Sequence, residues 1–305
     1  MRILNFGSLN IDYVYEMDHI LQPGETEASV QMRTYPGGKG LNQSIALVRA
    51  GQKVYHAGIV GKEDGDFLLQ VCRDNDICTD FIRKAEGKSG HAIIQVDAKG
   101  QNSILLYGGG NQKITREYVD EVLDQFDEGD ILILQNEVNL LDYIVEAAWN
   151  KKMLIALNPS PFDGRVLRCD LTKVSLFMVN EIEGRLLAQI EKTQEKNGSS
   201  IVEKILERFP HASVVLTMGE QGAFYGYGKE RYYQKSFPVK VIDTTAAGDT
   251  FTGYFIAGFA NGKETTEILE EAAKAAAIAV SRKGAAPSIP MMKEIMTGWI
   301  NEDIR

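Results

Sequence analysis

The stretch DTTAAGD at residues 243–249 leads directly into an apolar run over residues 251–259. Small residues followed by one acid at a helix start leave unpaired backbone N–H groups that can hold phosphate oxygens. The carboxylate of Asp249 falls in the first turn, beside those N–H groups, and can take a proton from an attacking hydroxyl. The stretch therefore predicts an enzyme that transfers a phosphoryl group to an alcohol. The alternative is that Asp249 only complements the helix dipole.

A second glycine-rich segment, GGKGLNQS at residues 37–44, opens another helix. Glycine on both sides of Lys39 lets a ligand approach the backbone closely, and Lys39 and Asn42 offer hydrogen-bond donors to hydroxyl groups. Gly51 stands where the left-handed residue that ends this helix would fall. A glycine-rich turn into a helix is also common in proteins without a ligand at that turn. The segment therefore indicates a binding site only in combination with the stretch at 243–249.

Apolar strand-like runs alternate with helical periodicity through most of the chain. Continuous Val, Ile and Leu runs between helices indicate a parallel sheet that is covered on both faces. The expected fold is therefore α/β, a doubly wound and mostly parallel sheet with helices on both faces. Strands are expected at residues 2–7, 53–60, 130–135, 153–158, 175–179 and 213–218, and helices at 42–50, 140–150, 199–208, 264–281 and 290–300.

Residues 11–35 and 89–107 break this rhythm, because their residues alternate in character around turn sequences. Such patterns are typical of antiparallel ribbons, although ordinary surface hairpins would look the same. No low-complexity linker separates the ribbons from the rest of the chain. We therefore expect a single domain over residues 1–305, with small β ribbons inserted at about 11–35 and 89–107.

The composition limits the classes of partner. The chain has 305 residues, of which 44% are hydrophobic, and a net charge of −9. An acidic surface argues against nucleic acid or anionic membrane as the main partner, and no apolar run reaches the roughly 18 residues of a membrane helix. Cys72, Cys78 and Cys169 show no metal-ligand spacing, so we expect reduced thiols in a cytoplasmic protein.

Together these motifs resemble the two signatures of the ribokinase-like (PfkB) family of carbohydrate and nucleoside kinases. The N-terminal signature is matched by residues 37–44, Gly51 and Gly61, and the C-terminal signature by residues 243–249 and Gly253. Tyr254 stands where the family usually keeps a small residue, and we expect it to affect helix packing more than chemistry. The resemblance covers nearly the whole chain. It implies that the ribbons form a small lid over the sugar site and pair two copies into a homodimer.

The phosphate site is expected at residues 243–249, because the chain has neither a GxxxxGK[ST] loop nor a GxGxxG segment after a strand. We assign Asp249 as the base that takes the proton of the acceptor hydroxyl. The backbone N–H groups of Ala246, Ala247 and Gly248 are the expected donors to the transferred phosphoryl group.

Two further segments are assigned to ATP and Mg²⁺ by the resemblance. Asn180 and Glu183 match the family's NxxE motif, which organises Mg²⁺ largely through water. The residues implied in nucleotide binding are Asn180, Thr217, Gly219, Gly222 and Gly248. As bare patterns, the first segment is a helix start with acids in its first turn and the second is a strand-to-hairpin turn. Lys274 lies one position from where the family often presents a residue towards adenine, and its contact is left open.

The segment RKGAAPS at residues 282–288 resembles one that helps to bind a monovalent cation in this family. The implied K⁺ ligands come from Asp243, Thr245, Ala279, Arg282, Gly284 and Ser288. Bound K⁺ would fix the shape of the neighbouring phosphate-binding turn, so the resemblance predicts activation by potassium. The alternative is a basic loop at a helix end, stabilised by the helix dipole.

The sugar site is expected where polar residues follow predicted strands. Asp12 can accept hydrogen bonds from two adjacent hydroxyls, Asn10 can both donate and accept, and Glu137 adds another acceptor. The sugar contacts implied by the resemblance are Asn10, Asp12, Gly38, Lys39, Asn42, Glu137 and Asp249. No additional arginine cluster accompanies them, which favours a free sugar over a phosphorylated one.

Some residues on the ribbons depart from the family's pattern. His91 and Gln95 stand where relatives tend to place apolar residues. Tyr13 and Tyr15 are also bulky. His91 flanks Ala92 and Ile94, which are expected to face the sugar. A related pentose or a nucleoside therefore stays open as the acceptor.

The sequence thus predicts an ATP-dependent, Mg²⁺-requiring kinase acting on the primary hydroxyl of a small free sugar, with D-ribose as the first candidate. A kinase for nucleosides or for other pentoses or hexoses is the alternative within the family. A non-catalytic sugar-binding regulator is less favoured, because it has no reason to keep Asp249 beside a phosphate cradle.

Overall fold

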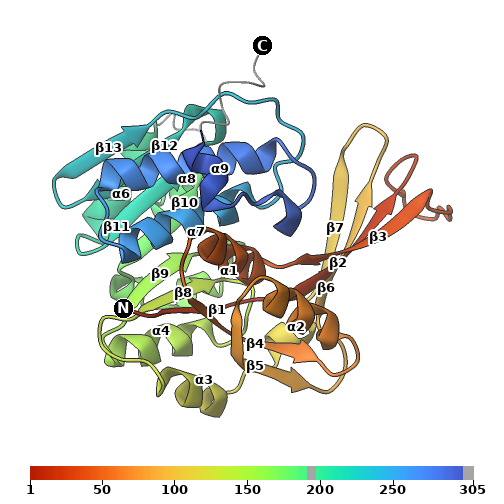
Figure 1. Cartoon of the computed structure of the whole chain (residues 1–305), viewed down its shortest axis with the longest axis horizontal. Coiled ribbons are helices and arrows are strands. Elements are labelled where there is room, and N and C mark those ends of the chain that lie inside the picture. Colours follow the sequence, from red (N-terminus) through yellow and green to blue (C-terminus); the bar gives the residue numbers. More distant parts are fainter. Residues whose placement is uncertain (191–196, 298–305) are drawn as a thin grey trace.

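The computed structural model describes residues 1–190 and 197–297, which form two β-sheets (Figure 1). The strands from β11 to β5 in the larger sheet all run parallel, and β12 and β13 add an antiparallel hairpin at one edge. In spatial order the sheet contains β13 (Glu230–Gln234), β12 (Ala223–Tyr227), β11 (Ser213–Thr217), β10 (Leu176–Asn180), β9 (Leu154–Asn158), β8 (Ile131–Gln135), β1 (Ile3–Phe6), β4 (Val54–Gly61) and β5 (Cys78–Ala85).

Helices cover both faces of this sheet, as predicted. Successive side chains of β1 enter different hydrophobic clusters, Ile3 on one face and Leu4 and Phe6 on the other. The helices on the Ile3 face are α1 (Lys39–Arg49), α2 (Gly65–Asp74), α7 (Ala247–Ala260), α8 (Thr265–Val280) and α9 (Met292–Met296). Those on the opposite face are α3 (Arg116–Leu123), α4 (Leu141–Asn150), α5 (Glu181–Leu187) and α6 (Gly198–Arg208). None of the helices in the described ranges combines the length and apolar character that crossing a bilayer requires.

Most of the predicted element boundaries agree with the structure to within a few residues, and Gly51 has the left-handed φ of 92° expected after α1. The helix predicted at 290–300 is shorter, since α9 ends at Met296 and residues 298–300 lie outside the described part of the chain. The sequence did not assign α2, β5, α3 or the edge strands β12 and β13.

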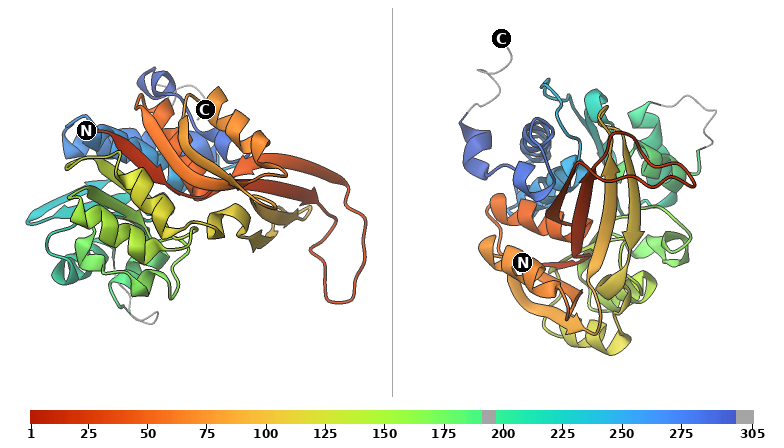
Figure 2. Two further views of the ribbon diagram at one scale, coloured as in Figure 1. Left: turned by 90° about the horizontal axis from the view of Figure 1, so that it is seen from below. Right: turned by 90° about the vertical axis from the view of Figure 1, so that its right-hand side faces the viewer.

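The smaller sheet is the predicted lid, and it projects beyond the larger sheet (Figure 1). It contains β3 (Gln31–Gly37), β2 (Asn10–Glu16), β6 (Gly90–Val96) and β7 (Asn102–Tyr107) in that spatial order. The pairs β2–β3 and β6–β7 are antiparallel ribbons, as expected, whereas β2 and β6 join them by a parallel pairing that the sequence did not predict. The loop at residues 17–30 extends furthest from the larger sheet (Figure 2).

Helices α1 and α7 bring together two signature segments that lie about 200 positions apart in the sequence. A Cβ added at Gly253 in α7 would stand 2.4 Å from Ala46 Cβ in α1, so the helices approach closely because this residue is glycine. Tyr254 beside it is fully buried, and its hydroxyl donates to the carbonyl of Pro290 at 2.8 Å. The unusual tyrosine therefore acts in packing, as its position suggested.

Replacing Gly40 by alanine is expected to lower the free energy of unfolding by about 1–3 kcal/mol, as overpacking typically does. The added Cβ would lie 2.4 Å from the backbone nitrogen of Ser8 and 2.7 Å from Gly7 Cα, and neither atom can move without shifting the end of β1. Urea unfolding of the two proteins measures the difference. The matched control is Gly164→Ala, whose Cβ meets no atom within 4 Å; equal stability of Gly40→Ala and the control would contradict the argument.

Candidate active site

Two neighbouring cavities meet at the N-terminus of α7. The larger has a volume of about 670 Å³ and the smaller about 270 Å³. Both are lined by Thr217 at the end of β11 and by Thr244, Ala247 and Gly248 of the predicted phosphate-binding stretch. The stretch therefore lies at the junction of two spaces, as a phosphoryl-transfer site requires.

Asp249 lines the smaller cavity, and its side chain is held at both oxygens. Oδ2 accepts from Nδ2 of Asn42 at 3.1 Å, and Oδ1 accepts from Nε2 of Gln43 at 3.0 Å. Both donors are amides of α1, so the close approach of α1 and α7 fixes the direction of the carboxylate.

Lys39, the first residue of α1, also lines this cavity. Burial opposes its charged form, but the carboxylates of Asp249, Glu137 and Glu183 outweigh that effect and raise the pKa of the ammonium group. The cavity thus holds a permanent positive charge beside the buried acid, which suits an anionic transition state.

The turn before α7 presents its backbone N–H groups as predicted, with one difference. Ala246 has a left-handed φ of 60°. The N–H of Ala247 donates to the carbonyl of Thr244 at 3.3 Å, whereas the N–H groups of Ala246 and Gly248 have no partner within the described residues. Two of the three predicted donors are therefore free for an anion, and the third makes a long bond.

Of the predicted sugar residues, Lys39 and Asp249 line the smaller cavity, and Asn42 and Glu137 contact these two directly. Glu137 Oε2 accepts from the backbone N–H of Lys39 at 3.0 Å and from the Ser8 hydroxyl at 2.5 Å. Burial, and then the nearby Glu137 carboxylate, raises the pKa of Asp12 to about 7. Asn10 accepts from Asn111 Nδ2 at 2.7 Å.

His91 does not lie beside the predicted sugar residues. Asp12 pairs with Ala92 across the parallel register, so these two side chains share one face of the lid. His91 lies on the other face, with its ring 5.9 Å from that of Tyr13 and 4.8 Å from that of Tyr107. His91, which departs from the family's pattern, therefore packs against aromatic side chains of the lid.

The larger cavity combines predicted nucleotide residues with an apolar wall. Thr217, Gly219 and Gly222 line it at one side. The apolar lining residues are Phe237, Val239, Val241, Phe251, Ala273, Ala276, Ala277 and Val280. Lys274, whose contact was left open, pairs with Glu270 at 2.6 Å and lies over the Phe237 ring. A mostly apolar cavity next to the predicted phosphate-binding turn fits a nucleotide base.

Asn180 and Glu183 form a capping box at the start of α5, because Asn180 Oδ1 accepts from Glu183 N at 2.9 Å and Glu183 Oε2 accepts from Asn180 N at 3.1 Å. Both residues also line the smaller cavity, where they face the same space as Asp249. The two residues therefore cap α5 and also line the cavity, so both interpretations of this segment are compatible. A carboxylate that contacts Mg²⁺ through water fits this position.

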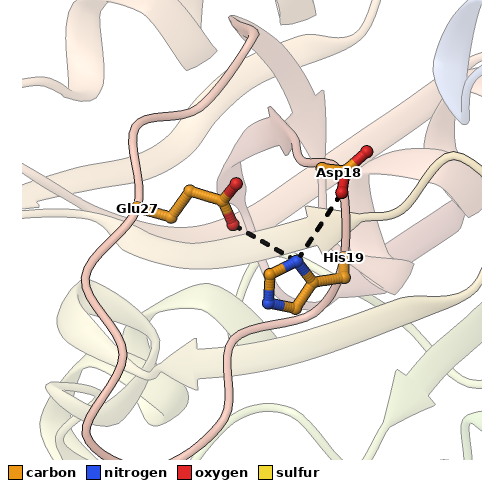
Figure 3. Close-up of side chains that lie close together, drawn as sticks. All are labelled: Asp18, His19 and Glu27. Atoms are coloured by element: carbon orange, nitrogen blue, oxygen red, sulfur yellow. Dashed lines mark ion pairs between the residues drawn. The ribbon is translucent and has the colours of Figure 1, made fainter.

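Another group of acidic side chains surrounds His19 on the lid loop (Figure 3). His19 Nδ1 lies 3.4 Å from Glu27 and 3.9 Å from Asp18, and Nε2 lies 2.9 Å from Glu25. The hydrogen bond and charge of Glu25, followed by the charge of Glu27, raise the pKa of His19. These exposed residues form ion pairs that tie the loop together, far from the predicted Mg²⁺ residues.

Two of the predicted K⁺ residues, Thr245 and Gly284, donate hydrogen bonds to a third, Asp243. Its Oδ1 accepts from the N–H and hydroxyl of Thr245, and its Oδ2 accepts from Gly284 N at 2.9 Å. Burial would raise the pKa of Asp243, but these hydrogen bonds outweigh it and lower the pKa. Ala279 accepts from the N–H of Arg282, and the Ser288 hydroxyl donates to Ala285. One carboxylate thus joins the loop at 282–288 to the turn at 243–245.

Comparison with known proteins identifies the family. The model of the pfkB family of carbohydrate kinases matches residues 2–292. The chain belongs to this family. A ribokinase of Staphylococcus aureus is 32% identical over 301 residues, which cover 96% of this chain and 98% of that protein. A ribokinase of Thermotoga maritima is 30% identical with a TM-score of 0.87, covering 98% of this chain and 99% of the other. An Arabidopsis thaliana ribokinase complexed with ribose and ATP is 26% identical with a TM-score of 0.84, covering 97% of both chains.

Membership of the pfkB family makes this chain a phosphotransferase with an alcohol acceptor. The hydrogen bonds of the structure point to further residues that the sequence did not predict. Ser8 accepts from Gly40 N at 3.2 Å while donating to Glu137, so it connects β1, α1 and the sugar region. Asn111 orients Asn10, and Gln43 holds Asp249. None of these residues carries a motif of its own, apart from the position of Gln43 inside the GGKGLNQS segment.

Proposed function

We propose that this chain transfers the γ-phosphoryl group of ATP to the primary hydroxyl of a small free sugar, converting D-ribose to ribose 5-phosphate. The observation that carries the proposal is the position of the α7 N-terminus, which lines both cavities and presents Asp249 to the smaller one. A nucleotide in the larger cavity would direct its phosphates to the shared turn, opposite an acceptor beside Asp249. The similar proteins that are ribokinases support the choice of ribose.

The chemistry assigned to the chain is one displacement. Asp249 takes the proton of the acceptor hydroxyl, the sugar oxygen forms a bond to the γ-phosphorus, and the bond from that phosphorus to the leaving ADP oxygen breaks. The N–H groups of Ala246, Ala247 and Gly248 donate to the phosphoryl oxygens as charge develops on them. Asn180 and Glu183 would hold Mg²⁺ at the smaller cavity, and the ion would supply positive charge against the phosphates.

The sugar is held by Asn10, Asp12, Gly38, Lys39, Asn42 and Glu137 in this proposal. Asn42 Oδ1 is buried without a hydrogen-bond partner in the described chain, which is costly unless a ligand donates to it. A sugar hydroxyl provides that donor. The carboxylates of Asp12 and Glu137 provide further acceptors for neighbouring hydroxyls, so the site suits a compound with several adjacent hydroxyl groups.

Sugar binding is expected to depend on pH through Asp12. Because the pKa of Asp12 is about 7 in the free protein, the carboxyl group is largely protonated below that value. Hydroxyl donors favour its ionised form, so binding must release a proton there, and the affinity should fall up to about tenfold per pH unit below pH 7. Calorimetry of ribose binding in buffers of different ionisation enthalpy measures this proton. Asp12→Asn is expected to remove the release, and proton uptake by the wild type would contradict the assignment.

We also propose that K⁺ binds between the turn at 243–245 and the loop at 282–288. Its ligands are the oxygens of Asp243, Thr245, Ala279, Arg282, Gly284 and Ser288. What supports this is that Asp243 already connects the two loops and keeps its carboxylate ionised. A cation there would stiffen the turn that leads into the phosphate-binding N–H groups, so turnover should rise with potassium.

The remaining proposals concern the organisation of the protein. Residues 1–305 form one kinase domain that acts in the cytoplasm, where ATP is available and where its unpaired cysteines would stay reduced.

The chain pairs with a second copy through the lid. The edge strand β7 supports this pairing because Ile104, Leu105, Leu106 and Tyr107 are each at least half exposed, and exposed apolar edge strands favour association.

The test is ADP release from ATP and Mg²⁺ across D-ribose, 2-deoxyribose, other pentoses, hexoses and nucleosides, with and without K⁺. We expect potassium-stimulated turnover with D-ribose well above the rest of the panel. A nucleoside or another sugar as the preferred acceptor would overturn the choice of ribose and leave the phosphoryl-transfer chemistry in place. No turnover with any acceptor would overturn the proposed activity.

A further inference from the structure

Gln43 lies in α1, fully buried, and contacts the carboxylate of Asp249. Its Nε2 donates to Asp249 Oδ1 at 3.0 Å and to Asn158 Oδ1 at 3.4 Å, and its Oε1 accepts from Gln135 Nε2 at 2.7 Å. Both ends of the Gln43 amide are thus used inside the protein, whereas the neighbouring Asn42 keeps an unpaired oxygen. Gln43 has nothing to offer a substrate, so its contact with Asp249 needs another reason.

The direction of the Gln43 amide is set by a chain of buried groups that begins at a backbone carbonyl. Asn5 in β1 lies 2.7 Å from the carbonyl oxygen of Gly40, which can only accept, so the Asn5 atom there is the amide nitrogen. Asn5 Oδ1 then accepts from Gln135 Nε2 at 3.0 Å, and Gln135 Nε2 also donates to Gln43 Oε1. With its oxygen held in this way, Gln43 must present its N–H to Asp249.

The hydrogen bonds from Asn5 through Ser44 to His56 also have fixed directions. Asn5 Nδ2 donates to the hydroxyl oxygen of Ser44 at 2.9 Å, and that oxygen lies 2.8 Å from His56 Nδ1. Burial lowers the pKa of His56 to about 4, so its ring is neutral. His56 Nε2 lies 3.3 Å from the carbonyl of Gly7 and carries the ring proton, which leaves Nδ1 to accept from Ser44. The network therefore has a single arrangement of donors and acceptors.

The network leaves one buried acceptor unsatisfied. Gln135 Oε1 has no partner among the described residues, and leaving a buried acceptor without a hydrogen bond destabilises the folded protein. Apolar side chains would avoid that loss. The penalty favours a role for the amides at Asp249 over a role in folding.

We propose that Gln43 is a positioning residue that keeps the Asp249 carboxylate directed at the acceptor hydroxyl, with Gln135 and Asn5 setting the direction of the Gln43 amide. The proposal rests on the proposed role of Asp249 as the base. Asn42 is shared with the sugar in the proposed site, whereas both ends of the Gln43 amide bond to groups of the protein.

The first test compares Gln43→Met with Gln52→Met. The Gln43 variant is expected to lower kcat about 10- to 100-fold, because a misdirected reacting group loses rate, while KM for the sugar stays within about threefold. Gln52 Nε2 donates to Ala257 O in α7 at 3.2 Å, so it bonds the same helix without contacting Asp249, and its variant should match the wild type.

Gln135→Met provides a second variant that leaves Gln43 in place, and it carries the test if Gln43→Met does not fold. It should lower kcat by a smaller factor, again with KM for the sugar within about threefold of the wild type. Unchanged kcat in both variants, a loss that appears in KM instead of kcat, or equal losses in Gln52→Met would overturn the proposal.

A double variant separates positioning from general damage. Because Gln43 acts through Asp249, adding Gln43→Met to Asp249→Asn should lower kcat by less than about threefold further. A structural role would lower kcat equally in both backgrounds and would overturn the proposal. High turnover of Asp249→Asn alone would instead contradict the proposed base, so the two failures are distinguishable.

Discussion

Replacing Asp249 by asparagine is expected to lower kcat by about 10²- to 10⁴-fold, the usual contribution of a positioned general base. Asparagine has nearly the same shape, but its amide cannot take the proton of the acceptor hydroxyl. ADP binding should stay close to wild type, since the larger cavity is lined by other residues. Steady-state kinetics with ATP and ribose, together with calorimetry of ADP binding, measure the two effects.

The control for this variant addresses the helix-dipole alternative directly. Asp142 also stands in the first turn of a helix, at the start of α4, and its side chain is exposed. Asp142→Asn removes a first-turn acid without touching either cavity, so kcat should not change. If Asp249→Asn kept wild-type turnover, Asp249 would be no more than a favourable charge at a helix N-terminus.

Replacing Asp12 by alanine is the second change with a large expected effect, a fall in kcat/KM for ribose of about 10²- to 10⁴-fold. Two hydrogen bonds from sugar hydroxyls to a carboxylate contribute about 1.5–3 kcal/mol each, and their sum corresponds to that range. The loss should appear mainly in KM, because Asp12 binds the sugar and takes no part in proton transfer. Kinetics over a range of ribose concentrations separate the two parameters.

Asp12→Asn keeps one acceptor oxygen at the same place, so its loss should be smaller than that of Asp12→Ala. Asp18→Ala is the matched control, since Asp18 lies on the same lid segment with its side chain exposed to solvent. Wild-type kcat/KM in Asp12→Ala would mean that the sugar does not reach the lid strand β2.

The alternation of apolar runs and helices predicted the parallel sheet well, because the strands of the larger sheet that it identified are mostly buried. These strands are β1, β4, β8, β9, β10 and β11. The edge strands were not predicted, because they are not buried in this way. In β5 the burial pattern is mixed, and β13 is largely exposed, so neither segment shows the continuous apolar run of a central strand. The parallel pairing of β2 with β6 joins segments about 80 positions apart, and no local pattern records such a pairing.

The site was predictable where its residues belong to motifs. Asp249, Lys39 and Asn42 meet as expected because glycines let α1, α7 and β1 approach closely. Ser8, Gln43 and Asn111 were missed because a single polar residue has no pattern, and its importance arises only from distant groups that folding brings to it. His91 was considered near the sugar because its neighbours Ala92 and Ile94 were expected to face it, whereas alternate residues of a strand face opposite sides.

Phosphoryl transfer to ribose can be followed by measuring ADP release and the sugar product in the same reaction, with the product identified by ³¹P and ¹H NMR. The wild type is expected to form ribose 5-phosphate in equal amount to ADP, with phosphorus coupled to the hydrogens on the primary carbon, and Asp249→Asn is expected to form almost none. ADP without phosphorylated sugar, phosphate on another hydroxyl, or equal product from the variant would contradict a kinase that uses Asp249 as its base.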